Sequence, residues 1–225
     1  EHAMTRADVL IERADLVATC RGPAPRAGRA QGDIAAIAHA SVAAWRGRIV
    51  AVGAADEVSR AVTLDEQATV IDGRGTTVVP GFVDSHTHIV YGGDRRQELA
   101  RRLAGATYAE IAAGGGGIVA TVAATRQATE AELVDAALPR LADALAQGTT
   151  TCEVKSGYGL DTDSELKMLR AIRALAARQP VDLSPTFMGA HEIPVEYRGR
   201  REDYIRLVIE EMLPAVAREG LAEWN

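Results

Sequence analysis

The chain is poor in cysteine, in aromatic residues and in basic charge, and each shortage excludes a class of protein. Its 225 residues include two cysteines, Cys20 and Cys152, so we expect no disulfide framework and a reducing, cytoplasmic setting. Aromatic residues make up 4% of the chain, so the core must consist mainly of Ala, Val, Leu and Ile. The net charge of -6 argues against nucleic acid or an anionic membrane surface as a partner. No apolar run approaches the roughly 18–20 residues of a membrane span.

The sequence pattern changes near Pro80. Residues 1–80 contain short apolar runs, such as 9–11 and 16–18, and Arg46-Gly47-Arg48 predicts a tight hairpin. We therefore expect a small β domain over residues 1–80. From residue 81 to 225, apolar strands alternate with helices, which indicates an α/β fold with a parallel sheet and right-handed crossovers.

Capping signals and apolar runs predict three strand–helix units after residue 80. Strands and helices alternate in the order 82–88, 130–147, 149–154, 163–178, 183–188 and 201–218. Thr129 with Glu132, and Thr162 with Glu165, have the spacing of a capping box at a helix start.

Two prolines in this region predict irregular helices, and the number of strands is too small for a closed barrel. Pro139 predicts a kink in the first helix, and Pro214 predicts a break in the third. Residues 221–225 read as the start of another strand. A closed (β/α)8 barrel needs eight strands and roughly 250 residues. We therefore expect the first part of a longer barrel, or a chain that a partner completes.

His86 and His88 are the most informative residues of the chain. They lie one residue apart in Pro-Gly-Phe-Val-Asp-Ser-His-Thr-His. In an extended strand alternate side chains share a face, so both imidazoles point the same way. Two imidazoles converging from one strand make half of a site for a first-row metal. Such ligands at the end of a buried strand lie where an α/β barrel keeps its chemistry.

Three more polar residues follow the predicted strands closely. His191 comes after the third strand, on the same edge as His88 if the sheet is parallel. Tyr158 lies in Ser-Gly-Tyr-Gly after the second strand and offers a hydrogen-bonding hydroxyl. Arg95 follows the His-x-His strand and offers a planar fork for a carboxylate. His39, in an alanine-rich stretch of the first region, reads as structural or exposed.

These blocks together resemble the amidohydrolase superfamily and, within it, the imidazolonepropionase family. The superfamily resemblance rests on the lead-in to His86 and His88 and on the Gly-Arg-Ile-Val-Ala-Val-Gly hairpin at 47–53. The narrower resemblance covers residues 41–214 almost continuously. It rests on Gly-Asp-Arg-Arg-Gln-Glu-Leu from 93, Glu-Val-Lys-Ser-Gly-Tyr-Gly-Leu from 153 and Thr-Phe-Met-Gly-Ala-His-Glu-Ile-Pro from 186.

The resemblance implies an amidohydrolase-type (β/α)8 barrel, of which 81–225 form the first part, beside a β-sandwich-like domain that 1–80 form incompletely. It implies one divalent metal ion, zinc or iron, held first by His86 and His88. Arg95, Tyr158 and His191 match substrate-binding positions, His191 also a catalytic one, and Tyr108 is a weaker candidate. The implied reaction hydrolyses the small molecule 4-imidazolone-5-propanoate to N-formimino-L-glutamate in histidine degradation, in a cytoplasmic homodimer.

The family's remaining metal ligands and its acidic residue lie, by this resemblance, beyond residue 225. Two histidines fall short of the three protein ligands usual for catalytic zinc, so we expect this chain alone to bind metal poorly and to be inactive. Two alternatives stay open. One is another amidohydrolase, dihydropyrimidinase-like or deaminase-like, in which Lys155 would carry a bridging carbamate between two metals. The other is an inactive, truncated chain that acts as a scaffold.

Overall fold

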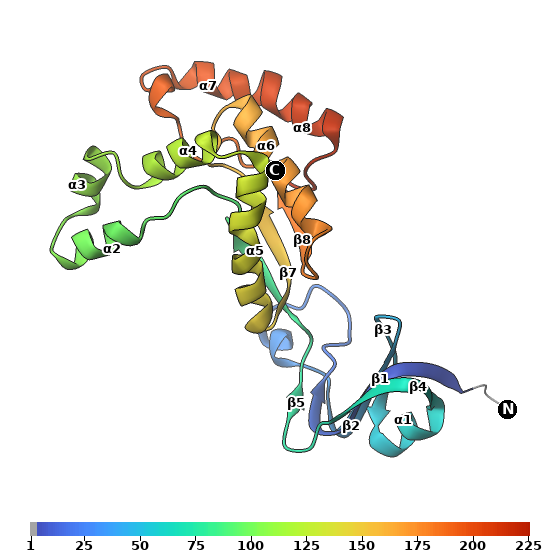
Figure 1. Cartoon of the computed structure of the whole chain (residues 1–225). Coiled ribbons are helices and arrows are strands. Elements are labelled where there is room, and N and C mark those ends of the chain that lie inside the picture. The colour runs from blue at the N-terminus through green and yellow to red at the C-terminus, as the bar shows by residue number, and fades with distance from the viewer. Residues whose placement is uncertain (1–3) are drawn as a thin grey trace. The chain divides into compact units, whose positions relative to one another are not determined.

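The computed structural model describes residues 4–225, apart from the side chains of residues 108, 112 and 113. The chain divides into two compact units, Glu1–Pro80 and Gly81–Asn225 (Figure 1). Among the described residues, no helix has both the length and the apolar composition that a membrane crossing requires.

The first unit is built on one mixed sheet of five strands. The strand order is β3-β2-β1-β4, and β5 pairs with the far end of β1. Its elements are β1 (Thr5–Ala18), a 3-10 turn (Gly28–Gly32), β2 (Ala36–Trp45), β3 (Arg48–Ala54), α1 (Ala55–Ala61), β4 (Val62–Asp72) and β5 (Thr77–Val78). The described part of this unit thus forms one mixed sheet. The sandwich-like domain that residues 1–80 were expected to form only in part stays a prediction.

One long strand, β1, pairs with three of the other strands of this sheet. The runs 9–11 and 16–18, expected as separate strands, both belong to β1, which continues through a bulge between Ile11 and Ala14. Before the bulge β1 pairs in parallel with β4, and after it with β5. Arg13 in the bulge has a positive φ of 57°, and the Ser41 hydroxyl accepts its N–H. The charged Glu12-Arg13 pair therefore bends the strand without ending it.

The second unit contains a three-stranded parallel sheet in the order β6-β7-β8. These strands, Phe82–Thr87, Thr149–Lys155 and Asp182–Thr186, lie where the sequence predicts them. A parallel bridge joins Thr186 to Trp224, and the N–H of Phe187 donates to the Trp224 carbonyl at 2.9 Å. Residues near the end of the chain therefore begin to pair with β8, as expected from the sequence.

Helices cover one face of this sheet. The helices of this unit are α2 (Arg96–Leu103), α3 (Tyr108–Ala113), α4 (Ile118–Gln127), α5 (Glu130–Ala146), α6 (Thr162–Ala176), α7 (Arg201–Leu207) and α8 (Leu213–Glu219), with a short 3-10 turn at Val195–Tyr197. Of these, α5 packs against β7 and α6 against β8. The Thr129–Glu132 capping box is present at the start of α5, which runs as one helix through Pro139. Between α7 and α8 a π-helical turn, Val208–Met212, precedes Pro214 and keeps the helix continuous where a break was expected.

The cap of α6 differs from the sequence prediction. Asp161 is the N-cap, and its carboxylate accepts the N–H of Ser164 at 2.7 Å. Thr162 is already helical, and its hydroxyl donates to the Glu211 carboxylate. The predicted Thr162–Glu165 capping box was therefore wrong, because Asp161 is also a strong cap and precedes Thr162 by one residue.

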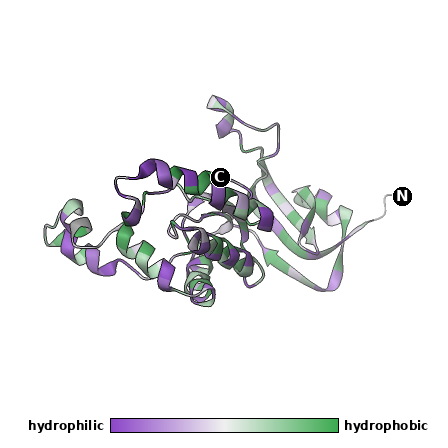
Figure 2. Cartoon of the chain, turned by 90° about the horizontal axis from the view of Figure 1, so that it is seen from above, coloured by the Kyte–Doolittle hydropathy of each residue, from purple (hydrophilic) through white to green (hydrophobic). Residues whose placement is uncertain are grey.

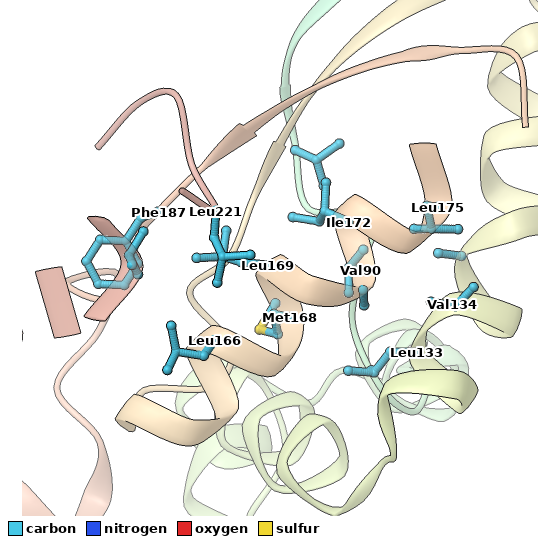
Figure 3. Close-up of a cluster of buried hydrophobic side chains, with 14 of the residues drawn as sticks. Val90, Leu133, Val134, Leu166, Met168, Leu169, Ile172, Leu175, Phe187 and Leu221 are labelled. Carbon is cyan, nitrogen blue, oxygen red and sulfur yellow. The ribbon is translucent and has the colours of Figure 1, made fainter. Parts of the chain in front are cut away.

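The core of the second unit lies between the sheet and the helices (Figure 3). Leu133 and Leu141 of α5 and Leu169 and Ile172 of α6 are at most 1% exposed. The pair in α5 is eight residues apart and the pair in α6 three residues apart, and these spacings keep each pair on one helix face. Burying each such side chain stabilises the fold by roughly 1.5–3 kcal/mol. This packing fixes the strand ends from which the site is built.

The segment from α2 to α3 projects away from the rest of the second unit (Figures 1 and 2). Hydrophilic and hydrophobic residues are mixed along it, and Leu99 and Leu103 of α2 are 61% and 81% exposed. Arg95 directly precedes α2 and therefore lies at the base of this projection.

Candidate active site

The carboxyl ends of the three parallel strands bring together the histidines singled out by sequence. His88 directly follows β6, the loop Ser156–Leu160 directly follows β7, and His191 lies five residues after the end of β8. Because neighbouring parallel strands end at the same edge of a sheet, these three segments meet there.

The rings of His88, Tyr158 and His191 form one compact cluster. The centroids of His88 and His191 are 4.7 Å apart with nearly parallel planes, at 20°. Tyr158 lies 4.8 Å from His88 and 5.3 Å from His191. His86 is more distant, with its centroid 6.0 Å from that of His88, and it is exposed. Three of the predicted site residues are therefore in mutual contact, with His86 beside them.

His88 is the best prepared of these groups to bind a cation. Its Nδ1 is buried and has no hydrogen-bond partner. Burial, followed by the nearby His191 and His86, lowers the pKa of His88 to about 4. The ring is therefore neutral near pH 7 and keeps a lone pair for a ligand.

His191 is held in one tautomer by the loop after β7. Its Nδ1 lies 2.9 Å from the carbonyl oxygen of Gly157. A carbonyl oxygen only accepts, so Nδ1 carries the proton and donates it. The neutral ring consequently has its free lone pair on Nε2, which is available to a substrate or to a proton.

Arg95 lies at the margin of this cluster. Its guanidinium pairs with the Glu98 carboxylate at 2.7 Å, and it is 42% exposed. Burial raises the pKa of the Tyr158 hydroxyl, and the positive charge of Arg95 acts in the opposite direction. Arg95 is thus close enough for its charge to be felt at Tyr158. The side chain of Tyr108, a weaker candidate, lies outside the described residues.

Lys155, the residue on which the carbamate alternative depends, has an ion-pair partner. Its ammonium group pairs with the Glu153 carboxylate, and the two side chains are 14% and 15% exposed. Within the described part of the chain, no group of three or more His, Cys, Asp or Glu side chains is arranged to hold a metal.

Two open grooves lie in the second unit, and the residues that line them do not include His88, Tyr158 or His191. One, of about 670 Å³, is lined by Leu160, Arg126 and Glu192 among others. The other, of about 730 Å³, lies over the open face of the sheet and is lined by residues including Lys155 and Met188.

Sequence reasoning missed three residues whose side chains form hydrogen bonds with the backbone of the segments that carry the ring cluster. The Glu165 carboxylate receives backbone N–H groups from the loop after β7. Arg126 donates to the Gly159 carbonyl at 2.6 Å and pairs with Asp161. Arg140 of α5 donates to the Ile89 carbonyl, just after His88, at 2.7 Å. The one available signal was the Ser-Gly-Tyr-Gly-Leu segment, whose closely spaced N–H groups require an acceptor.

Curated proteins similar to this chain carry one name. The chain is 57% identical over 222 residues to the imidazolonepropionase of Symbiobacterium thermophilum, covering 98% of this chain and 52% of that protein. It is 51% identical over 220 residues to the imidazolonepropionase of Chloroflexus aggregans, covering 97% of this chain and 51% of that protein. The chain therefore spans about half the length of the curated relatives it matches. No family model matches the chain.

Solved structures show the same fold at lower identity. A triazine hydrolase variant superposes with a TM-score of 0.56 at 22% identity, over 80% of this chain and 35% of that one. The triazine hydrolase itself, from Arthrobacter aurescens, gives a TM-score of 0.53 at 21% identity, with the same coverage. These likenesses show the fold alone, a mixed α/β fold that matches 35% of each of those chains.

Proposed function

Because this chain belongs to the imidazolonepropionase family over the stretch that it shares with these relatives, we propose that the full-length protein hydrolyses 4-imidazolone-5-propanoate to N-formimino-L-glutamate. In this reaction water adds to the ring carbonyl carbon, and the bond from that carbon to the ring nitrogen breaks. The carbon becomes a carboxylate, and the nitrogen stays in the formimino group. The observation that carries the proposal is the contact among His88, Tyr158 and His191 at one sheet edge.

His88 and His86 are the residues of this chain that would hold a divalent metal. The fit rests on the unpartnered, buried Nδ1 of His88 and on its neutral ring. A zinc or iron ion bound there would supply Lewis-acid activation of water at neutral pH. The metal's identity stays a prediction, and metal analysis of the purified protein decides it.

His191 is the proposed catalytic group. With Nδ1 donating to the Gly157 carbonyl, Nε2 is the atom that can take a proton, or return one once the ring is charged. An imidazolium at this position would also stabilise negative charge on the oxygen of the attacked carbonyl. The hydrogen bond to Gly157 thus assigns the chemistry to one ring nitrogen.

Arg95 and Tyr158 are the proposed substrate-binding residues. Arg95 would pair with the propionate carboxylate of the substrate, which must share the guanidinium with Glu98 or displace it. Tyr158 packs against both histidines, so its hydroxyl can orient the imidazolone ring beside them. Such binding places the scissile bond against the histidine cluster.

The test is hydrolysis of 4-imidazolone-5-propanoate by the full-length protein that the family resemblance implies, with N-formimino-L-glutamate identified by mass spectrometry, and the kinetic tests below use the same protein. We expect chelator-sensitive turnover that His86→Asn abolishes. The matched control is His39→Asn, since His39 is exposed in the other unit. Chelator-resistant turnover, or full activity in His86→Asn, would contradict the metal assignment.

The carbamate alternative predicts a different metal count. Carbamate formation requires a neutral amine, whereas Lys155 is paired with Glu153 in a little-exposed site. We therefore favour one metal per active site over a lysine-bridged pair. A stoichiometry of two metals with Lys155 carbamylated would favour the dihydropyrimidinase-like reading instead.

Assembly and location also stay proposals. We propose a homodimer in the cytoplasm, where the free thiols Cys20 and Cys152 would remain reduced. Sedimentation analysis of the purified protein measures the number of subunits directly.

A further inference from the structure

Glu165 is a carboxylate without a role in the proposed chemistry, yet it is one of the most buried groups of the chain. It lies in the first turn of α6 and is 0% exposed. Asp161 caps this helix, so the helix itself does not need the Glu165 side chain. A buried carboxylate costs free energy unless several donors surround it.

The donors around Glu165 come from the loop after β7. Its Oε1 accepts the N–H groups of Gly159 and Leu160, both at 2.8 Å, and its Oε2 accepts that of Gly157 at 3.0 Å. The Ser156 hydroxyl also bonds to this carboxyl group and accepts the N–H of Met188 at 2.8 Å. One side chain therefore accepts three of the five backbone N–H groups of the loop Ser156–Leu160.

This loop would not hold its shape unaided. Gly157 has a φ of 101°, and Leu160 has a φ of 56°, which is unfavourable for a residue with a branched side chain. A Cβ at Gly159 would lie 2.5 Å from the backbone nitrogen of Glu165. The loop is thus pressed against the start of α6 in a conformation that its bonds to Glu165 maintain.

The opposite side of the same loop faces the ring cluster. Tyr158 lies between the two anchored glycines, and its ring contacts His88 and His191. Gly157 donates its N–H to Glu165, and its carbonyl oxygen accepts a hydrogen bond from Nδ1 of His191. Glu165 therefore acts on Tyr158 and His191 through one intervening residue, Gly157. Gly157 precedes Tyr158 in the chain and accepts the hydrogen bond from His191.

We propose that Glu165 is a positioning residue, whose bonds to Gly157, Gly159 and Leu160 set the place of Tyr158 and the tautomer and orientation of His191. The inference rests on the proposed function, because it assigns Glu165 to the hydrolytic site. It predicts that loosening this loop lowers the rate of the chemical step more than it weakens the fold.

The test is Glu165→Gln, which keeps the shape of the side chain and turns one accepting oxygen into a donor facing an N–H. We expect kcat to fall roughly tenfold to a hundredfold, with a smaller change in KM. Glu132→Gln is the matched control, since Glu132 accepts the Thr129 N–H at 2.8 Å in the first turn of α5. It should leave kcat within about twofold of the original value.

A double-mutant cycle with Tyr158→Phe separates positioning from general stability. If Glu165 acts through the loop, the combined loss in kcat is smaller than the product of the two single losses. Independent, multiplying losses would overturn the proposal. So would a Glu165→Gln variant that melts at a lower temperature with kcat and KM unchanged.

A second readout needs no turnover, so it distinguishes failure of this inference from failure of the proposed function. In the free protein, Glu165→Gln should accelerate amide hydrogen exchange at Gly157, Gly159 and Leu160 and abolish the NMR contact between the Tyr158 and His191 rings. If the full-length wild-type protein does not hydrolyse 4-imidazolone-5-propanoate but Glu165→Gln shows these changes, the proposed substrate is refuted and the positioning role is upheld. Unchanged exchange and ring contacts would refute the positioning, whether or not the protein is active. Glu165→Ala is the less useful variant, because it leaves three buried donors unpaired and is expected to unfold.

Discussion

His88 shows how burial prepares a single residue for chemistry. In the folded protein its pKa lies near 4, whereas an unfolded histidine titrates near 6.5. Between these values the unfolded state binds more protons than the folded state. The free energy of unfolding should therefore fall as the pH drops from about 6.5 to about 4, and then level off.

This pH dependence can be measured in metal-free protein by urea unfolding. His88 keeps partial solvent contact, so we expect an effect on the order of 1 kcal/mol across that window. His88→Gln should flatten the curve in that window, while the control His39→Gln should not. An unchanged slope in His88→Gln would show that another group titrates there.

The two nitrogens of His191 can be separated by substitution. Asparagine places an amide N–H near the position of Nδ1 and lacks an atom at Nε2. His191→Asn should therefore keep the bond to the Gly157 carbonyl and most of the stability, yet lower kcat by about 10²–10⁴-fold. Steady-state kinetics and thermal melting are the measurements. An equally large loss of stability would point to a structural role for Nε2.

At the scale of elements, α5 supports the segment that directly follows His86 and His88, the histidines proposed to bind a metal. Arg140 donates to the carbonyl oxygens of Ile89 and Tyr91, at 2.7 and 3.2 Å, and its guanidinium lies 3.6 Å from the centroid of the Tyr91 ring. Desolvation by burial lowers the pKa of Arg140. The side chain thus ties the segment after β6 to the middle of a helix.

Removing this tie should be costly. Arg140→Met keeps the apolar stem and leaves two carbonyls without their donor, so we expect a loss of about 2 kcal/mol in urea unfolding. The matched control is Arg178→Met, whose ion pair with Asp135 is exposed and should contribute less than about 0.5 kcal/mol. Equal losses in the two variants would argue against a special role for Arg140.

The start of α6 gives a second prediction at this scale. Asp161→Ala removes the N-cap and one partner of Arg126, so the free energy of unfolding should fall by about 1–2 kcal/mol. Thr162→Ala, one residue later, should cost less than about 0.5 kcal/mol, because its bond to Glu211 is exposed. A larger loss of stability in Thr162→Ala than in Asp161→Ala would indicate that Thr162 is the N-cap.

At the scale of the whole molecule, the sheet of the second unit leaves apolar surface uncovered. Phe82 and Val83 of the edge strand β6 are 58% and 68% exposed. An unpaired edge with exposed apolar residues favours pairing with another chain. This chain by itself should therefore associate as its concentration rises.

Size-exclusion chromatography over a range of concentrations tests this association. Val83→Lys should shift the protein toward the monomer, because a charge on an edge strand opposes pairing. Ile209→Lys, at a 57% exposed position on the helical side, is the matched control and should have little effect. If both variants elute at the same volume at every concentration, the chains do not associate through the edge strand β6.

Much of this molecule follows from local sequence rules. The His-x-His strand, the α5 capping box and the alternation of strands with helices depend on residues within a few positions of one another, so the sequence alone determined them. The same short blocks carry the family resemblance and nominated His86, His88, Tyr158 and His191.

Tertiary structure alone decided which of these groups are prepared to act. The low pKa of His88 and the proton on Nδ1 of His191 depend on burial and on a carbonyl 34 residues away in the chain. Glu165 has the spacing of a helix cap, and only the folded loop turns it into the acceptor of three N–H groups. Desolvation and hydrogen bonding between distant segments exist only once the strands and helices have packed, so no local pattern contains them.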